Sequence, residues 1–183
     1  MFTKMKCMKY LFKSLKCVVV FLLIATITVS CNGKKVDNKV EETRINNTLD
    51  SFNVAAAKAD YNSYFNYFTD DAIFIGTDAT ERWDKKAFML WAKPYFDKRK
   101  TWNFTSIDRH IYFDNTGNTA WFDELLNTQM KICRGSGILI KNDSTWKIKQ
   151  YVLSVTVPNS KLDSTIQTKA AIEDSIISKL SKK

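Results

Sequence analysis

Histidine is nearly absent from this sequence, and cysteine is scarce. Among 183 residues there is one histidine, His110, and there are four cysteines. Histidine and cysteine side chains are the usual ligands of zinc, and none of them cluster here at the spacing of a zinc site. The sequence therefore predicts no metal centre, and it contains no motif for any other cofactor.

Glycine is also scarce, and no glycine-rich loop precedes a helix as it does in nucleotide-binding sites. The closely spaced Gly135 and Gly137 lie inside a strand pattern, where glycine is typical of a bulge or a tight bend. The basic residues form no stripe with interleaved aromatic residues, so we expect no nucleic-acid partner. The densest basic run, residues 98–100, predicts a solvated helix end.

A long apolar run is missing as well. The longest covers the 12 residues from Val18 to Val29, whereas a helix that spans a bilayer needs about 20. Five lysines precede this run and Ser30 and Cys31 follow it, an order that resembles a bacterial lipoprotein signal peptide over residues 1–30. Cys31 would then be the lipidated first residue of the mature chain. An uncleaved signal anchor is the alternative.

This resemblance sets expectations for location, charge and cysteine chemistry. The mature chain would be lipid-anchored through Cys31 to a membrane of the bacterial cell envelope, facing the periplasm. Five of the 28 basic residues and none of the 19 acidic ones lie in residues 1–30, so the net charge falls from +9 to +4. Cys133 is then the single remaining cysteine. We expect no disulfide bond and interpret Cys133 as a small buried hydrophobic residue.

The first half of the mature chain predicts helices. Residues 31–42 are polar, without apolar periodicity, and predict a tether to the domain over residues 43–158. Apolar residues at three- and four-residue spacing predict a helix over 43–60, and the aromatic segment 61–68 continues it. A short strand over 72–75 comes next, and Asp84 is the expected N-cap of a helix that ends near Ala92. Pro94 predicts a second short helix, because proline interrupts a continuous one.

The second half of the domain predicts strands. Four segments, residues 101–113, 118–131, 133–141 and 145–157, are joined by short turns and end at Pro158. This order predicts an α+β fold, in which N-terminal helices pack on a curved antiparallel sheet and the signal helix precedes them. Residues 159–183 form a separate C-terminal tail with an apolar stripe, and the tail is either helical or partly disordered.

Five segments carry a family resemblance: residues 76–83, 93–96, 121–124, 134–137 and 146–148. Together they are similar to the SnoaL-like branch of the nuclear transport factor 2-like superfamily, and the resemblance covers the whole domain. It implies a cone-shaped fold with a pocket between sheet and helices, and often a homodimer that packs through the sheet. Members include cyclases, isomerases, dehydratases and non-catalytic ligand-binding or assembly domains, so the fold alone does not set the function.

Asp78 and Arg82 are the first candidate site residues. If the loop after Gly76 turns helically, their side chains are four residues apart and can form an ion pair. The pair would either orient a polar substrate at the mouth of the pocket or fix the loop. Both interpretations stay open.

Asp123 and Glu124 are neighbours in a strand, so only one of them faces the interior. We favour Glu124, because its neighbours on that face are apolar. They are Ala120, Phe122 and Leu126. A carboxyl group in such surroundings would have a raised pKa and could act as a general acid or base. The alternative is a structural ion pair with Arg82 or Arg134.

His110 shares a strand face with Asp108 and Tyr112. An aspartate and a histidine on one face suit proton transfer, but this row is polar and we expect it to face solvent or a sheet interface. The many aromatic residues predict a packed core. Two of them, Trp91 and Trp121, are expected to touch a ligand.

The expected ligand-binding residues are Asp78, Arg82, Trp91, Tyr95, Trp121 and Glu124. No residue is given a catalytic role, because the acid–base sets of the cyclases and isomerases cannot be placed on this sequence. The sequence favours a membrane-tethered, homodimeric domain that binds a small apolar or amphipathic organic molecule. Two alternatives stay open. One is a cyclase-, isomerase- or dehydratase-type enzyme that uses an acidic residue of the pocket, and the other is a non-catalytic dimerisation or assembly module.

Overall fold

The computed structural model describes residues 38–182. The strands are β1 (Phe68–Ile75), β2 (Arg82–Asp84), β3 (Thr105–Phe113), β4 (Thr119–Thr128), β5 (Lys131–Asn142) and β6 (Thr145–Val155). The helices are α2 (Asn38–Ala57), α3 (Tyr61–Asn66), α4 (Lys85–Asp97) and α5 (Leu162–Leu180), with a 3-10 turn η1 (Asn159–Lys161). The lipoprotein signal, Cys31 and most of the tether lie outside the described residues and stay predictions.

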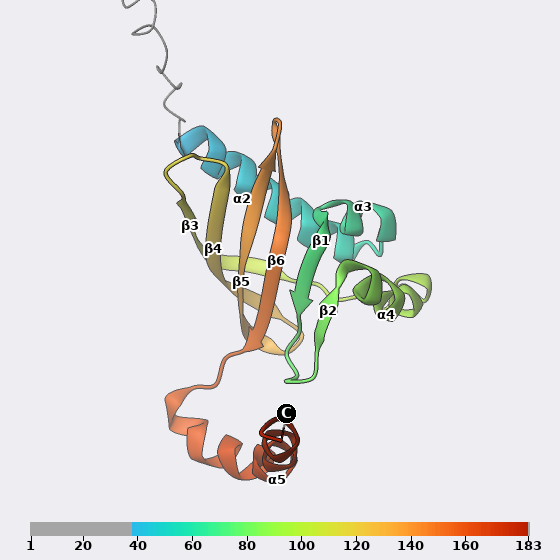
Figure 1. Cartoon of the computed structure of the whole chain (residues 1–183), viewed down its shortest axis with the longest axis vertical. Helices are drawn as coiled ribbons and strands as arrows, with labels where there is room; N and C mark the ends of the chain where they lie inside the picture. The colour runs from blue at the N-terminus through green and yellow to red at the C-terminus, as the bar shows by residue number, and fades with distance from the viewer. Residues whose placement is uncertain (1–37, 183) are drawn as a thin grey trace, which may run out of the picture. The chain divides into compact units, whose positions relative to one another are not determined.

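The strands of the described region form one curved sheet in the order β2-β1-β6-β5-β4-β3 (Figure 1). Neighbours from β3 to β6 run antiparallel, as the short turns predict, and β1 pairs antiparallel with β2. β1 also pairs in parallel with β6, a long-range contact that the sequence pattern did not predict. Helices from the first half of the domain cover one face, which we call the inner face. The predicted α+β fold is confirmed.

α2 lies across the inner face and contacts β3 and β6 (Figure 1). Its residues at three- and four-residue spacing, Ile45, Leu49, Phe52 and Ala56, are all buried. Full burial of a large apolar side chain contributes roughly 1.5–3 kcal/mol, so this stripe anchors the helix on the sheet. The periodicity therefore identified the correct face of the helix.

The first turn of α2 is fixed by Glu41, a buried carboxylate. Trp146 of β6 donates its indole N–H to Glu41 Oε2 at 2.8 Å, and Lys141 Nζ of β5 lies 2.9 Å from Oε1. Burial alone would raise the pKa of Glu41, but the hydrogen bonds from Lys141 and Trp146 and the charges of Lys141 and Arg44 lower it below its usual value. These contacts hold the start of the helix, which explains why α2 begins before residue 43.

α4 is a single helix, although Pro94 predicts a break. Asp84 caps the helix as expected, because its side chain accepts a hydrogen bond from the backbone N–H of Ala87 at 2.8 Å. Pro94 lies in the last turn of the helix, which ends three residues later at Asp97; the proline removes one backbone hydrogen bond but does not divide the helix in two. Tyr61 donates its hydroxyl to the carbonyl oxygen of Met89 at 3.1 Å, one residue before the Leu90 carbonyl that Pro94 leaves without its helical donor.

Gly135 and Gly137 of β5 allow close packing within the sheet. A Cβ atom on Gly135 would lie 2.6 Å from the hydroxyl of Tyr151, and one on Gly137 would lie 2.2 Å from the backbone oxygen of Gln150. A side chain at either position would force neighbouring groups apart. Both glycines lie within strand β5, as the sequence pattern predicts.

The C-terminal tail is helical rather than partly disordered. α5 covers Leu162–Leu180, and none of its residues is buried. Within residues 38–182, no helix combines the length and the apolar character that a membrane crossing requires.

Candidate functional site

A pocket of about 170 Å³ opens beside β1, β2 and α4, and we call it the mouth pocket. The segment before β3, the β4–β5 turn and β6 also contribute residues to the lining of this pocket. Most of the lining side chains are apolar. They are Phe74, Trp83, Phe88, Trp91, Trp102, Phe104, Met130 and Leu153, and they are accompanied by Gly76, Thr77, Glu81 and Gln129.

Three tryptophans form a wall of the mouth pocket. The ring centroids of Trp83 and Trp91 are 4.8 Å apart, and those of Trp91 and Trp102 are 6.3 Å apart. Phe88 stacks behind them, 5.9 Å from Trp91. Trp91 is 38% exposed, so this wall is open to solvent on one side. A preformed set of flat aromatic faces suits an apolar, planar ligand.

The interior behind the mouth pocket is filled with aromatic rings. Phe74 and Phe88 stack 4.0 Å apart, and Tyr151 lies 5.7 Å from Phe74 with the two rings nearly parallel. Phe52 stacks on Tyr64 at 4.5 Å. The core beside the mouth pocket is therefore packed with side chains, and Phe74 and Phe88 of this core line the pocket.

One group in this aromatic core lacks a well-placed partner. Tyr64 is 1% exposed, and its hydroxyl makes no hydrogen bond of normal geometry among the described residues. Burial raises the pKa of Tyr64 well above its usual value, and the nearby indole of Trp102 opposes this only in part. A buried polar group without a partner costs about 1–3 kcal/mol. The hydroxyl therefore weakens the core that it belongs to.

Glu124 of β4 is the centre of a second, closed site, which we call the polar centre. Its side chain is 1% exposed and faces the inner side, as predicted. Arg109 of β3 donates from Nε to Glu124 Oε2 at 2.9 Å, and Tyr151 of β6 donates its hydroxyl to Oε1 at 3.1 Å. Tyr151 reaches the carboxylate past Gly135, which pairs directly with Glu124 in the sheet. Burial first, and then the charge of Glu124, raise the pKa of Tyr151 well above its usual value.

The polar centre corrects the expected ion-pair partner of Glu124. Its apolar neighbours along β4 are present, but a cation and a hydroxyl from other strands engage both carboxylate oxygens. The structural ion pair is formed with Arg109 rather than with Arg82 or Arg134. Sequence spacing missed Arg109 because its position opposite Glu124 depends on strand pairing and on a register shift near the start of β3.

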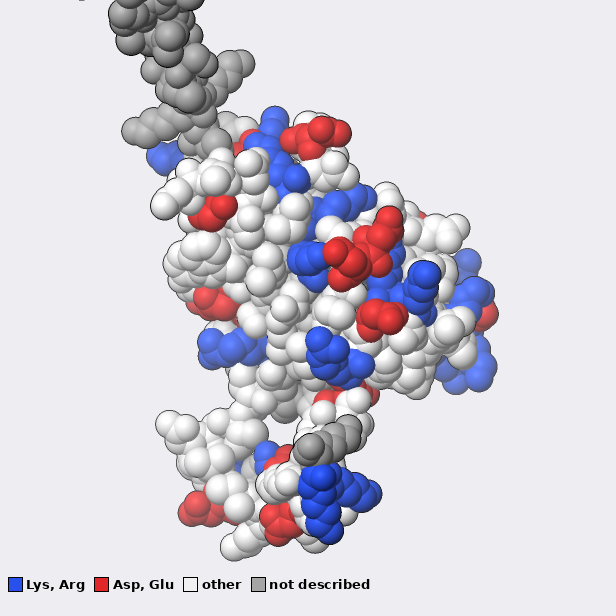
Figure 2. All heavy atoms as spheres, in the orientation of Figure 1, with Lys and Arg blue, Asp and Glu red and all other residues white. Residues whose placement is uncertain are grey.

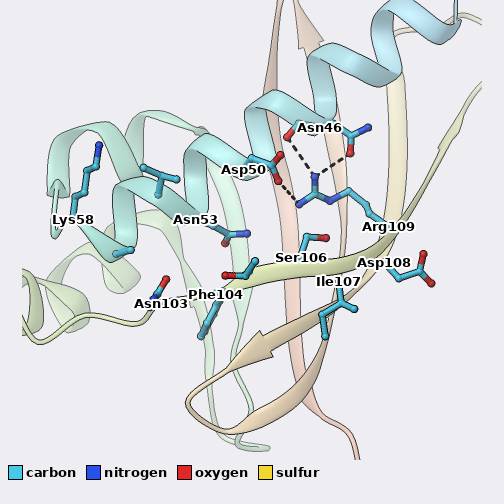
Figure 3. Close-up of a pocket in the computed structure, with 13 residues that line it drawn as sticks. Asn46, Asp50, Asn53, Lys58, Asn103, Phe104, Ser106, Ile107, Asp108 and Arg109 are labelled. Atoms are coloured by element: carbon cyan, nitrogen blue, oxygen red, sulfur yellow. Dashed lines mark hydrogen bonds and ion pairs between the residues drawn. The ribbon is translucent and has the colours of Figure 1, made fainter.

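Arg109 also borders a polar groove of about 650 Å³ between α2 and β3. Figure 3 shows Asn46 and Asp50 of α2 pointing toward its guanidinium group. Nη1 donates to Asn46 Oδ1 at 3.0 Å, and Nη2 lies 3.0 Å from Asp50 Oδ1 as an ion pair. The Arg109 side chain is 6% exposed, so Arg109 separates the groove from the polar centre. Glu124 lines neither the groove nor the mouth pocket.

Asp78 and Arg82 do not form the expected ion pair. The Asp78 carboxylate accepts hydrogen bonds from the hydroxyl and the backbone N–H of Thr80, at 2.6 and 2.8 Å, and these bonds lower its pKa. Arg82 begins β2, is exposed and has no ion-pair partner within residues 38–182. The loop is instead closed by Glu81, whose carbonyl oxygen accepts from the N–H of Gly76 at 2.9 Å and whose carboxylate accepts from the N–H of Asp78 at 3.2 Å.

The remaining expected residues are spread over the molecule. Tyr95 is 43% exposed on α4, with its ring centroid 5.0 Å from that of Trp91, but it does not line the mouth pocket. Trp121 lies on the outer face of the sheet, stacked on Tyr112 at 5.9 Å. His110 is also exposed there, as its polar row predicts. Of the six expected ligand-binding residues, Trp91 lines the mouth pocket, and ligand contacts by the other five stay predictions.

The titratable side chains of the described region do not form a metal site. Within residues 38–182, no group of three or more histidine, cysteine, aspartate or glutamate side chains is arranged to hold a metal ion. Cys133 is buried and free, and its surroundings fit the expected small hydrophobic residue.

Solved structures share this architecture. An NTF2-like protein of unknown function from Pseudomonas putida is 12% identical, with a TM-score of 0.57 over 66% of this chain and 90% of that one. An NTF2-like family protein from Streptomyces avermitilis, named as a candidate dehydratase, is 10% identical, with a TM-score of 0.58 over 66% of this chain and 99% of that one. At these identities the likeness shows the fold alone.

The sequence comparison places the same region in a family. The profile of a SnoaL-like domain matches residues 45–158. No curated protein sequence matches the chain. Because the profile match spans more than half of the chain and coincides with the helices and the sheet described above, the chain belongs to the SnoaL-like family.

Proposed function

We propose that this domain binds a small, single-ring organic molecule in the mouth pocket and does not transform it. The observation that carries this proposal is the wall of Trp83, Trp91 and Trp102 around an apolar space at the open end of the fold. The family includes ligand-binding and isomerase- or dehydratase-type domains, and the details of this site favour binding.

The volume of the mouth pocket limits the size of the ligand. Pockets for drug-sized molecules measure about 300–1,000 Å³, whereas an apolar cavity of about 150 Å³ holds benzene. At about 170 Å³, the mouth pocket accommodates one aromatic ring and excludes a steroid nucleus. A substituent on the ring would extend past Trp91 into solvent, because that residue is 38% exposed.

The position of the polar centre argues against catalysis. Both oxygens of Glu124 are engaged, by Arg109 and Tyr151, and Glu124 is not part of the pocket lining. A general base must come within hydrogen-bond reach of the proton that it abstracts. Glu81, the carboxylate that does line the mouth pocket, accepts a hydrogen bond from the backbone of its own loop. We therefore assign both residues structural roles: Glu124 stabilises the fold through Arg109 and Tyr151, and Glu81 closes its loop.

Saturation-transfer NMR and calorimetric titration with p-cresol, toluene and androstenedione test this function. We expect p-cresol and toluene to bind with dissociation constants of about 0.1–1 mM, and androstenedione not to bind. Trp91→Ala should weaken p-cresol binding at least tenfold, because it removes one wall of the pocket. Trp121→Ala is the matched control, since Trp121 is similarly exposed but lies on the outer face. Equal losses in the two variants, or no binding of either single-ring molecule, would rule the proposal out.

We also propose that the domain is tethered to a membrane of the cell envelope, facing the periplasm, through a lipid on Cys31. The support is the order of lysines, apolar run, Ser30 and Cys31 in the sequence. Mass spectrometry of the protein isolated from membranes tests this point. The expected mass is that of a chain starting at a diacylated Cys31, and an unmodified Cys31 in a chain that keeps residues 1–30 would refute it.

Dimerisation through the outer face of the sheet is a second candidate role. Tyr112, Trp121 and Ile138 pair across β3, β4 and β5 and form an apolar row on that face. Tyr112 and Trp121 are each 45% exposed. Covering this row in a homodimer would remove an apolar surface from water. Sedimentation velocity should give a dimer for the wild type and a monomer for Trp121→Glu, while a monomeric wild type would exclude this role.

A further inference from the structure

We propose that the exposed side of α4 is a docking surface for an anionic membrane. The surface, which we call the α4 patch, combines exposed apolar residues with basic ones. Its apolar members are Leu90, Trp91, Pro94 and Tyr95, and its basic members are Lys86, Lys98, Arg99 and Lys100. This inference goes beyond the proposed ligand site, and it does not depend on a lipid at Cys31.

The apolar members of the patch are unusual for a helix surface. α4 buries Phe88, Ala92 and Phe96 against the rest of the domain. On the opposite side Leu90 is 77% exposed, and on the flank of the helix Trp91 and Tyr95, one turn apart, are 38% and 43% exposed. An aliphatic side chain beside tryptophan and tyrosine is the composition with which interfacial helices enter the headgroup region of a bilayer.

The basic side chains of the patch favour an anionic partner. None of its four basic side chains forms an ion pair with another residue of the described region. Basic side chains gather at the side of the molecule where Figure 1 places α4 (Figure 2). The helix dipole favours a positive charge at the C-terminal end, but that effect does not account for Lys86 in the first turn or for the exposed Leu90. An anionic lipid surface complements both the apolar and the basic members.

Arg99 has a left-handed backbone conformation, which glycine adopts with less strain. Its φ angle is 51°, in the left-handed region, where it ends α4: the N–H of Arg99 bonds to the carbonyl of Phe96, and the N–H of Lys100 to that of Tyr95. A side chain in this conformation is strained relative to glycine. Replacing Arg99 by glycine would therefore remove the charge without destabilising the end of the helix.

Quenching of tryptophan fluorescence by brominated phosphatidylcholine tests the docking. The full chain, as isolated from membranes, is placed on vesicles of this lipid alone or with about 30% phosphatidylglycerol. We expect strong quenching only with phosphatidylglycerol, and its disappearance in Trp91→Phe would identify the quenched residue. The ratio of docked to undocked protein should fall about fivefold in Arg99→Gly and at least about tenfold in Leu90→Glu.

Three controls separate loss of docking from loss of folding, from a general loss of exposed apolar surface and from loss of ligand binding. Arg99→Gly should unfold at the same or a higher urea concentration than the wild type, so a loss of docking cannot come from instability. Ile172→Glu changes an apolar residue of α5 that is 68% exposed, and it should leave quenching unchanged. Leu90 does not line the mouth pocket, so Leu90→Glu should still bind p-cresol. Equal quenching on both kinds of vesicle, or unchanged quenching in both Arg99→Gly and Leu90→Glu, would overturn the proposal.

Discussion

The polar centre and the mouth pocket lie in the same fold but have opposite properties. In the polar centre, Glu124 is held by Arg109 and Tyr151, and it is closed to solvent. The mouth pocket is apolar, open on the side of Trp91, and is lined by aromatic rings that pack against one another. The comparison teaches that a carboxylate buried in this family's fold is not by itself a reactive group. The groups around it decide between chemistry and folding.

The largest expected effect concerns the ion pair of the polar centre. Arg109→Ala leaves Glu124 as a buried charge without a cation, and we expect the free energy of unfolding to fall by about 3–5 kcal/mol. Urea unfolding followed by circular dichroism measures it. Arg82→Ala, which changes an exposed arginine without an ion-pair partner in the described region, is the control and should have an effect below about 0.5 kcal/mol. Equal effects in the two variants would show that the polar centre is not structural.

Two buried tyrosines sharpen the comparison. Tyr151 and Tyr64 are each 1% exposed, but in the described region only the hydroxyl of Tyr151 makes a hydrogen bond of normal geometry, and that of Tyr64 has only a poorly placed Trp102 indole beside it. Tyr151→Phe should destabilise the protein by about 1.5–3 kcal/mol, because Glu124 loses a donor. Tyr64→Phe should stabilise it by about 1 kcal/mol, because a buried hydroxyl without a well-placed partner is removed. Thermal unfolding of both variants gives the signs, and a destabilised Tyr64→Phe would reveal a partner for that hydroxyl.

A smaller effect, dependent on pH, is expected at Glu41, a second buried carboxylate. Its pKa is lower in the folded chain than in the unfolded one, so its ionised form stabilises the fold above the unfolded pKa of 4.5. This contribution is lost as the pH falls through the lowered pKa of the folded state. Glu41→Gln should therefore lower the free energy of unfolding by about 1 kcal/mol at pH 7 and by less at pH 3. Urea unfolding at the two pH values checks it, and a difference that grows in acid would contradict the assignment.

The sequence predicted the parts of this molecule that depend on local patterns. The stripe of Ile45 and Leu49, the cap at Asp84 and the inward side of Glu124 follow from periodicity and from single-residue preferences. Sequence reasoning failed where strands far apart in the chain meet. Arg109 reaches Glu124 only through strand pairing, and the parallel contact of β1 with β6 has no local pattern.

The mouth pocket was only partly predictable for the same reason. Trp91 was expected to contact a ligand, but the other walls come from β2 and from the segment before β3, which supply Trp83 and Trp102. These residues meet only in the folded chain. Pro94 does not break α4: it lies in the last turn, and the helix runs through it to Asp97.

The most direct test of the central claim compares p-cresol binding to the wild type, to Trp91→Ala and to Glu124→Gln, each confirmed as folded by circular dichroism. If the mouth pocket binds the ligand and the polar centre serves folding, Trp91→Ala weakens binding at least tenfold and Glu124→Gln leaves the dissociation constant within about twofold. The opposite result, with binding lost in Glu124→Gln and retained in Trp91→Ala, would place the ligand at the polar centre and contradict this account.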